Sequence, residues 1–387
     1  MLALLVGAAP LVAMGVVVVA VAVNLSGPVT LDLVPEPSDF GMNLVLSSNG
    51  AVAYVTEPSQ SRLLVVDART GRVTARIQVG TTPTGLAISP SGRQVWVVDT
   101  GLLSLGSGTT VSVVSTATNK LVGTVSLDIG QSALADRAAG NDLVWGGAID
   151  VVFSPDGKEA YVTVNGIITS GEVEVIDTST LKVTGALGGP GTVGVWHPTS
   201  VAVSPDGREV WVSETSTIGS GTDEPADSIL VFEATTRALR ARIPVGQGPF
   251  FMALSQDGRY AYVADKESCD VKEIDADTLQ VVATVRAVSA DGCPFGIAAG
   301  ASDGTAEFVT GRDHTVSQGA EGNAFEIVDF ATRRIAVLRH IGVDPVTVAA
   351  PRRGDLAYVV EADRPAVYVL NASNGAEVTT WKLSGAT

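Results

Sequence analysis

The chain has 387 residues, of which 45% are hydrophobic and 17% are charged, a composition typical of a packed globular protein rather than a disordered one. Acidic residues outnumber basic ones by 41 to 25, so the net charge is −16. Because such a surface repels phosphate backbones, we expect no nucleic-acid partner.

The first 23 residues carry no charged side chain and consist mostly of Leu, Val, Ala and Gly. At about 1.5 Å per residue, a helix of this length crosses a bilayer core. The segment therefore predicts one N-terminal hydrophobic helix, acting as a transmembrane anchor or as a signal segment that is cleaved. We expect residues 24–39 to be a linker and possible closing strand. The protein is then membrane-anchored and extracytoplasmic, in the periplasm or at the cell surface, or secreted after cleavage.

Residues 40–384 repeat one four-strand unit seven times. Each copy has an apolar strand that ends in a turn closing on glycine, as in Ser154-Pro155-Asp156-Gly157. A second strand follows with one aromatic residue at a fixed place: Tyr54, Trp96, Tyr161, Trp211, Tyr262, Phe308 and Tyr358. A third strand, a short polar turn and a fourth strand complete the unit. Four antiparallel strands repeated in this way predict an all-β fold, a seven-bladed β-propeller of four-stranded antiparallel blades.

The second strands carry a recognisable sequence pattern. Tyr54-Val55-Thr56-Glu57 and Tyr161-Val162-Thr163-Val164 make the chain resemble the YVTN-repeat propellers of the surface-layer and periplasmic type. The resemblance implies the fold but leaves the chemistry open, since such propellers include surface-layer proteins, periplasmic binding proteins and subunits of redox enzymes.

Loop lengths predict which face binds. The connections from second to third strands and from one blade to the next vary in length, and both types emerge on the same face of the propeller. We call this the loop-rich face. Its candidate binding residues are His197, Arg312, Asp313 and His314. Two histidines beside carboxylates suit a transition metal or a general base, while hydrogen-bonded loop histidines are the alternative.

Acidic residues recur at the end of the second strand, where the resembling family has Asn. The five carboxylates at this position are Glu57, Asp99, Glu214, Asp265 and Glu361. A partial ring of such oxygen ligands is a candidate metal site, with Ca²⁺ as the possible cofactor. The alternative is that each carboxylate accepts hydrogen bonds from backbone amides of its own loop. No cofactor is certain from these residues.

The two cysteines, Cys269 and Cys293, fall in neighbouring loops of the loop-rich face. We expect a disulfide between them, which fits an extracytoplasmic location. Free buried thiols, or thiols used for metal or redox chemistry, are the alternatives.

No motif of nucleophilic, zinc-dependent or haem chemistry occurs in the sequence. The sequence therefore favours a non-catalytic binding or scaffold module that meets a protein or polysaccharide of the cell envelope through its loop-rich face, with the membrane contacted through the N-terminal segment. The alternative is a propeller enzyme, either a lactonase-like hydrolase with a bound cation or a subunit of a periplasmic oxidoreductase.

Overall fold

The computed structural model describes twelve stretches of the chain: residues 42–101, 110–127, 147–165, 171–188, 195–215, 227–287, 293–300, 304–311, 324–342, 345–350, 355–361 and 365–383. The chain divides into two compact units, Met1–Pro35 and Glu36–Thr387. All described residues belong to the second unit, and the predicted helix over residues 1–23 lies outside them.

The described strands form seven four-stranded antiparallel sheets, numbered here in chain order. Sheets 1 to 3 are β1 (Leu44–Leu46), β2 (Val52–Glu57), β3 (Arg62–Asp67), β4 (Arg72–Gln78); β5 (Pro83–Ile88), β6 (Gln94–Asp99), β7 (Thr110–Ser115), β8 (Lys120–Ser126); and β9 (Gly147–Phe153), β10 (Glu159–Asn165), β11 (Glu172–Asp177), β12 (Lys182–Leu187). Sheets 4 and 5 are β13 (Pro198–Val203), β14 (Glu209–Glu214), β15 (Ser228–Glu233), β16 (Leu239–Pro244); and β17 (Pro249–Leu254), β18 (Tyr260–Asp265), β19 (Asp270–Asp275), β20 (Gln280–Arg286). Sheets 6 and 7 are β21 (Cys293–Ala299), β22 (Thr305–Gly311), β23 (Ala324–Asp329), β24 (Arg334–His340); and β25 (Pro345–Ala349), β26 (Leu356–Glu361), β27 (Ala366–Asn371), β28 (Glu377–Lys382).

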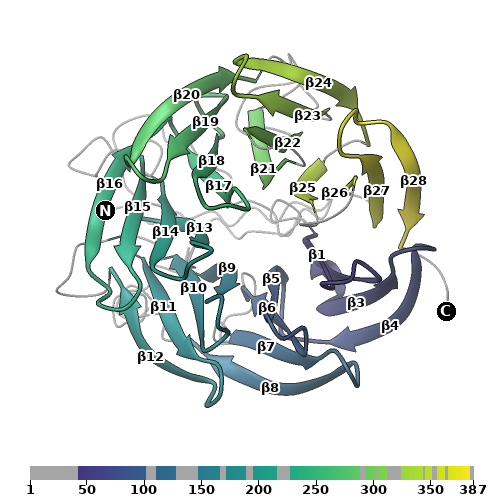
Figure 1. Ribbon diagram of the computed structural model, residues 1–387. Helices are drawn as coiled ribbons and strands as arrows, with labels where there is room; N and C mark the ends of the chain where they lie inside the picture. Colours follow the sequence, from purple (N-terminus) through teal and green to yellow (C-terminus); the bar gives the residue numbers. More distant parts are fainter. Residues whose placement is uncertain are drawn as a thin grey trace, which may run out of the picture. The chain divides into compact units, whose positions relative to one another are not determined.

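The sheets of this unit are arranged in a ring, with the first strand of each sheet innermost and the fourth at the rim (Figure 1). Each innermost strand contacts the innermost strand of the next sheet, and β25 contacts β1, so the last sheet meets the first. This arrangement is a β-propeller.

The hydrophobic core lies between neighbouring sheets. One buried cluster, for example, joins Leu44 and Val55 of sheet 1 to Val360 and Trp381 of sheet 7. Comparable clusters join each other pair of neighbours around the ring. The alternation of buried and exposed positions along each strand supplies these faces, because a strand sends successive side chains to opposite sides of its sheet.

The predicted fold class needs two corrections. Six sheets are full blades, in which every strand has five to seven residues, whereas sheet 1 opens on β1 with only three residues. We therefore count six full blades and one sheet with a short inner strand, not seven blades of equal form. The predicted N-terminal helix is not supported either. The helical element in the described stretches is one 3₁₀ turn, Pro58–Gln60, and no described helix is long and apolar enough to cross a membrane.

The turns between first and second strands depend on glycine. Gly50, Gly92, Gly157, Gly207, Gly258 and Gly304 have φ between 68° and 75°, a region that favours glycine, and Gly354 lies outside the described residues. In the clearest copy, the Ser154 hydroxyl donates to Asp156 Oδ1 at 2.8 Å, and the Gly157 N–H donates to the Ser154 carbonyl.

Candidate functional site

A shallow hollow lies where the innermost strands begin, at the centre of the ring, with about 290 Å³ of empty volume that includes open solvent. It is lined by residues from six of the seven sheets: Asn43, Thr84, Gly85, Ile149, Phe250, Phe251, Phe295 and Thr347. These residues stand within the first three positions of their strands, or directly before β1 in the case of Asn43. That end of the strands is also where each second strand ends, so the hollow belongs to the loop-rich face.

Three phenylalanines from β17 and β21 form one wall of this hollow. Phe250 stacks on Phe295 with ring centroids 4.5 Å apart and planes inclined by 28°. Phe251 meets both rings edge-on, at 5.1 Å from Phe250 and 5.6 Å from Phe295. All three side chains are only partly buried, whereas six aromatic residues of the second strands are buried: Tyr54, Trp96, Tyr161, Trp211, Tyr262 and Tyr358. We call these three residues the phenylalanine wall.

Hydroxyl groups of sheet 4 fix the backbone of β17. The Thr199 hydroxyl donates to the Phe250 carbonyl at 2.8 Å, and the Thr215 hydroxyl donates to the Pro249 carbonyl at 2.7 Å. Ser213 also donates to the Phe250 carbonyl, at 3.2 Å. These bonds hold the carbonyl groups of Pro249 and Phe250 in place. They therefore fix the direction in which the Phe250 side chain leaves the strand.

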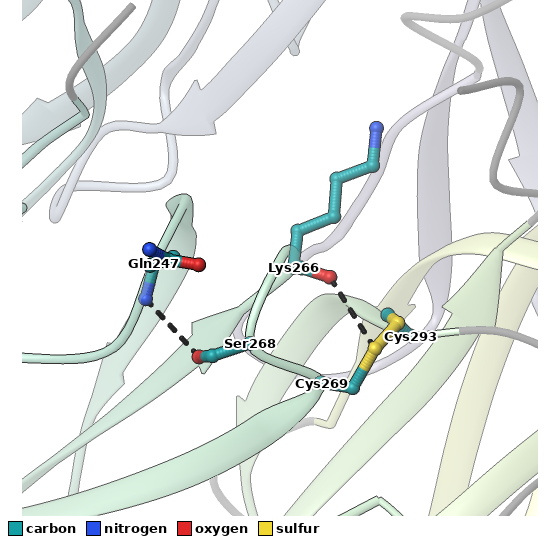
Figure 2. The surroundings of a disulfide bond; sticks show 5 residues. All are labelled: Gln247, Lys266, Ser268, Cys269 and Cys293. Atoms are coloured by element: carbon teal, nitrogen blue, oxygen red, sulfur yellow. Dashed lines mark hydrogen bonds between the residues drawn. A yellow bond between two sulfur atoms is a disulfide. The ribbon is translucent and has the colours of Figure 1, made fainter. Parts of the chain in front are cut away.

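A disulfide holds the other side of the wall. The structure joins Cys269, in the connection from β18 to β19, to Cys293 at the start of β21, with Cα atoms 4.6 Å apart (Figure 2). Cys293 precedes Phe295 by two residues, and Cys269 Sγ lies 3.8 Å from the Lys266 carbonyl oxygen. The bond therefore links the loop that carries Lys266 to the strand that carries Phe295.

Lys266 places a positive charge at the phenylalanine wall. Figure 2 shows its side chain extending away from the disulfide. Its Nζ lies 5.4 Å from the ring centroid of Phe295 and 6.0 Å from that of Phe250, within cation–π range. Among the described residues Lys266 forms no ion pair, whereas Lys272 nearby lies 3.0 Å from Asp265 Oδ2. None of the described side chains that line the hollow is charged.

The five carboxylates predicted as a metal site lie in separate sheets. Asp265 accepts a hydrogen bond from the Gly246 N–H at 2.9 Å, and Glu214 accepts one from the Trp196 N–H at 2.9 Å. In each case the donor belongs to the connection that enters the sheet from the preceding one. Within the stretches that the structure describes, no group of three or more His, Cys, Asp or Glu is placed to hold one metal ion.

The connections between successive sheets carry glycines where there is no room for a side chain beside these carboxylates. A Cβ added to Gly80 would lie 2.4 Å from the Asp99 carboxylate, and one added to Gly246 would lie 2.4 Å from Asp265 Oδ2. Glu361 takes the same place beside Gly342 and accepts from the Tyr368 hydroxyl at 3.2 Å. These acids therefore tie each entering connection to its sheet.

Burial perturbs two of these groups strongly. Desolvation raises the pKa of Asp99 to about 6, although the Ser112 and Thr110 hydroxyls donate to Oδ2 at 2.7 and 3.0 Å. Desolvation raises the pKa of Asp265 to about 7, against the opposing effect of the Lys272 ammonium. Glu214 is fully buried and pairs with Arg242 of β16. Glu57 lies at the end of β2, opposite Arg62 of β3.

Sequence reasoning missed two acids of the same kind. In sheets 3 and 6 the second strand offers no carboxylate at its end, but the third strand carries buried Glu174 or Glu326. Each stands at the third position of its strand, as Ser112 and Lys272 do in sheets 2 and 5. The signal available was an acidic residue inside an otherwise apolar strand, Glu174 in Val173-Glu174-Val175 and Glu326 in Phe325-Glu326-Ile327.

Most of the binding residues predicted for the loop-rich face lie outside the residues that the structure describes. Arg312, Asp313 and His314 lie outside the described residues. His197 stands directly before β13, near the hollow's end of the sheet, with a φ of 38° and a partly buried side chain. The structure therefore does not bring His197 and His314 together within its described part.

Comparisons with known proteins support the fold. A solved structure of Kuenenia stuttgartiensis hydrazine synthase is similar over 90% of this chain and 99% of that chain, with a TM-score of 0.67 and 18% sequence identity. The chain is a β-propeller. No protein-family model matches it, and no curated protein sequence matches it. At 18% identity the similarity concerns the fold alone, so the YVTN family stays a prediction and the enzyme's activity does not transfer.

Proposed function

We propose that this chain is an extracytoplasmic binding module, tethered to the membrane or secreted, that recognises its ligand through the loop-rich face of the propeller. The hollow at the centre of that face is the binding site. The observation that carries the proposal is the phenylalanine wall, three partly exposed aromatic rings in mutual contact at the place where six sheets converge.

The energetics of aromatic burial support a ligand at this wall. Full burial of one phenylalanine side chain stabilises a protein by about 1.5–3 kcal/mol relative to leaving it exposed. Sheets 2, 4 and 7 place small residues at the corresponding inner positions, namely Thr84, Gly85, Ser200 and Thr347, whereas sheet 3 places Ile149 there. Phe250, Phe251 and Phe295 thus expose apolar surface that folding does not require, which is typical of a ligand site.

The extracytoplasmic location is supported by the disulfide between Cys269 and Cys293, because such bonds persist in oxidising compartments. Alkaline phosphatase fused after Thr387 tests this location, since that enzyme acquires activity only outside the cytoplasm. A fusion that is produced in full but inactive in intact cells contradicts the location and leaves the binding proposal standing.

Thermal unfolding of the full chain against a panel of small aromatic, aliphatic and carbohydrate compounds tests the binding proposal. We expect at least one compound class to raise the midpoint in a concentration-dependent way, because ligands that bind only the folded state stabilise it. The variant F250L/F295L keeps apolar side chains at both positions but loses the stacked rings, so the same compounds should no longer raise its midpoint. The proposal is contradicted if no compound raises the unfolding midpoint of either protein, or if the compounds raise both midpoints equally.

A further inference from the structure

We propose that the ligand of this hollow is an organic anion with a planar aromatic ring, held by the phenylalanine wall through its ring and by Lys266 through its carboxylate or sulfonate. This inference rests on the proposed function and adds the chemical class of the ligand. It is carried by the position of one ammonium group against two stacked rings in an otherwise uncharged hollow.

Lys266 supplies the positive charge at the wall. The chain carries a net charge of −16, so carboxylates are abundant. The ammonium of Lys272, six residues further on, contacts both Asp265 and Asp270. Lys266 instead rests over Phe250 and Phe295 and pairs with no carboxylate of the described residues. No carboxylate of the described residues therefore occupies its three N–H donors, which can meet an anionic group that reaches the wall.

The loop around Lys266 restricts where this charge can go. Its backbone N–H donates to the Gly248 carbonyl at 2.9 Å, and the disulfide fixes the chain three residues further on. Ser268 Oγ accepts from the Gln247 N–H at 3.1 Å, which ties the same loop to the connection entering sheet 5 (Figure 2). The stem of Lys266 therefore starts from a fixed point beside the wall, so the ammonium marks one end of the site.

Ring geometry indicates a planar ligand. Phe250 and Phe295 are already stacked, and a further aromatic ring gains offset-stacked or edge contacts of the same kind, each worth about 0.5–1.5 kcal/mol beyond area burial. Among the residues that line the rest of the hollow, Asn43, Thr84 and Thr347 are polar, while Ile149 is apolar. Gly85 lets β5 approach β9 closely there, because a Cβ would lie 2.3 Å from the Ile149 carbonyl oxygen.

The same features disfavour other ligands. A cationic ligand would be repelled by Lys266, the one charged group at the wall in the described part of the chain. A neutral aromatic compound would use the rings but gain nothing from the ammonium. Affinity should therefore follow the order anion, neutral compound, cation for ligands of one ring system.

Isothermal titration calorimetry of the full chain at low salt tests this order with three probes that share a naphthalene ring: naphthalene-2-sulfonate, 2-naphthol and 2-naphthylmethylammonium. We expect the sulfonate to bind at least tenfold more tightly than 2-naphthol, and the ammonium compound to bind most weakly. K266M keeps the length of the side chain without its charge and should abolish the difference between sulfonate and naphthol. K182M removes the same charge from an exposed position at the start of β12 and should leave the difference unchanged.

Each outcome decides something. If all three probes bind the wild type with equal affinity and none binds F295L, the anion preference is wrong and the proposed function is supported. A sulfonate preference that survives in K266M overturns the role of Lys266. If none of the three naphthalene probes binds, but other compounds stabilise the protein only when the phenylalanine wall is intact, the aromatic-anion proposal is wrong and the binding site stands. Failure of every compound in both experiments contradicts the proposed function as well.

Discussion

Replacing Asp99 with asparagine should change how the stability of the propeller depends on pH. Asp99 is only 1% exposed, and its pKa rises from 3.8 to about 6 because burial disfavours the charged form. A group whose pKa is higher in the folded than in the unfolded state binds more protons when folded, so its contribution to stability falls as pH rises through that interval. A pKa difference of this size between the two states corresponds to about 3 kcal/mol of stability, lost between roughly pH 4 and pH 8.

About half of this change falls between pH 5 and pH 8, where the exposed carboxylates are already ionised. The asparagine side chain has no charge to desolvate, so D99N should gain stability relative to the wild type as pH rises over that range. Its amide oxygen still accepts from the Ser112 and Thr110 hydroxyls that now donate to Asp99 Oδ2. Comparison of the two proteins therefore isolates the charge.

Guanidinium unfolding at pH 5, 6, 7 and 8 measures this difference, with D277N at an exposed turn position as the control. From pH 5 to pH 8, we expect the unfolding free energy of D99N to rise by about 1.5 kcal/mol relative to that of the wild type, as judged from the guanidinium midpoints. D277N should show no such trend. A gap for D99N that stays constant over the range refutes the assignment of a buried, uncompensated charge to Asp99.

Two further outcomes follow from pairs and bonds at the same face. R242M should lower the free energy of unfolding by about 3 kcal/mol or more, because it leaves buried Glu214 without its ionic partner. R240M on the same strand should lower it by under about 1 kcal/mol. Equal unfolding midpoints of the two variants in denaturant titrations would contradict this. C293A should cost about 3 kcal/mol, from a loop of 24 residues, and reductant should lower the unfolding midpoint of the wild type only; two alkylated thiols in the unreduced wild type would rule out the bond.

The turns show what the sequence does predict. Glycine, proline and aspartate at fixed places mark the reversals between first and second strands, because those residues have distinct backbone preferences. All six turn glycines that the structure describes have positive φ, and a second strand follows each of them. The short β1 was not predicted, since strand length depends on pairing with β2 rather than on local composition.

Sheet 6 shows where counting along the sequence fails. Gly304 stands one residue before the strand residue Thr305, whereas Gly50 stands two residues before Val52. The register then pairs Glu307 with Ile327, at the place where Tyr54 pairs with Val65. Phe308 and Gly311 are therefore one residue out of step with their predicted equivalents. The glycine stands one residue closer to the second strand in sheet 6 than in sheet 1, and only the hydrogen-bond register reveals this difference.

The candidate site illustrates a different limit. The acids at the ends of second strands were visible as a repeated departure from the family pattern. Their backbone donors, however, come from the connections between one sheet and the next, as Gly246 does for Asp265. The phenylalanine wall was not predicted, since Phe250 and Phe295 are 45 residues apart and meet only where sheets 5 and 6 pack together. The usable signal was the pair Pro249-Phe250 and Pro294-Phe295, where other innermost strands begin Pro83-Thr84 and Pro198-Thr199.

The central claim is that the hollow among the innermost strands binds a ligand at the phenylalanine wall. A crystal structure of the full chain grown with naphthalene-2-sulfonate tests it most directly. The account predicts density for the ring stacked beside Phe250 and Phe295, with the sulfonate within hydrogen-bonding distance of Lys266 Nζ. An empty hollow at a probe concentration that saturates binding in solution, or density for the probe at another surface, would contradict it.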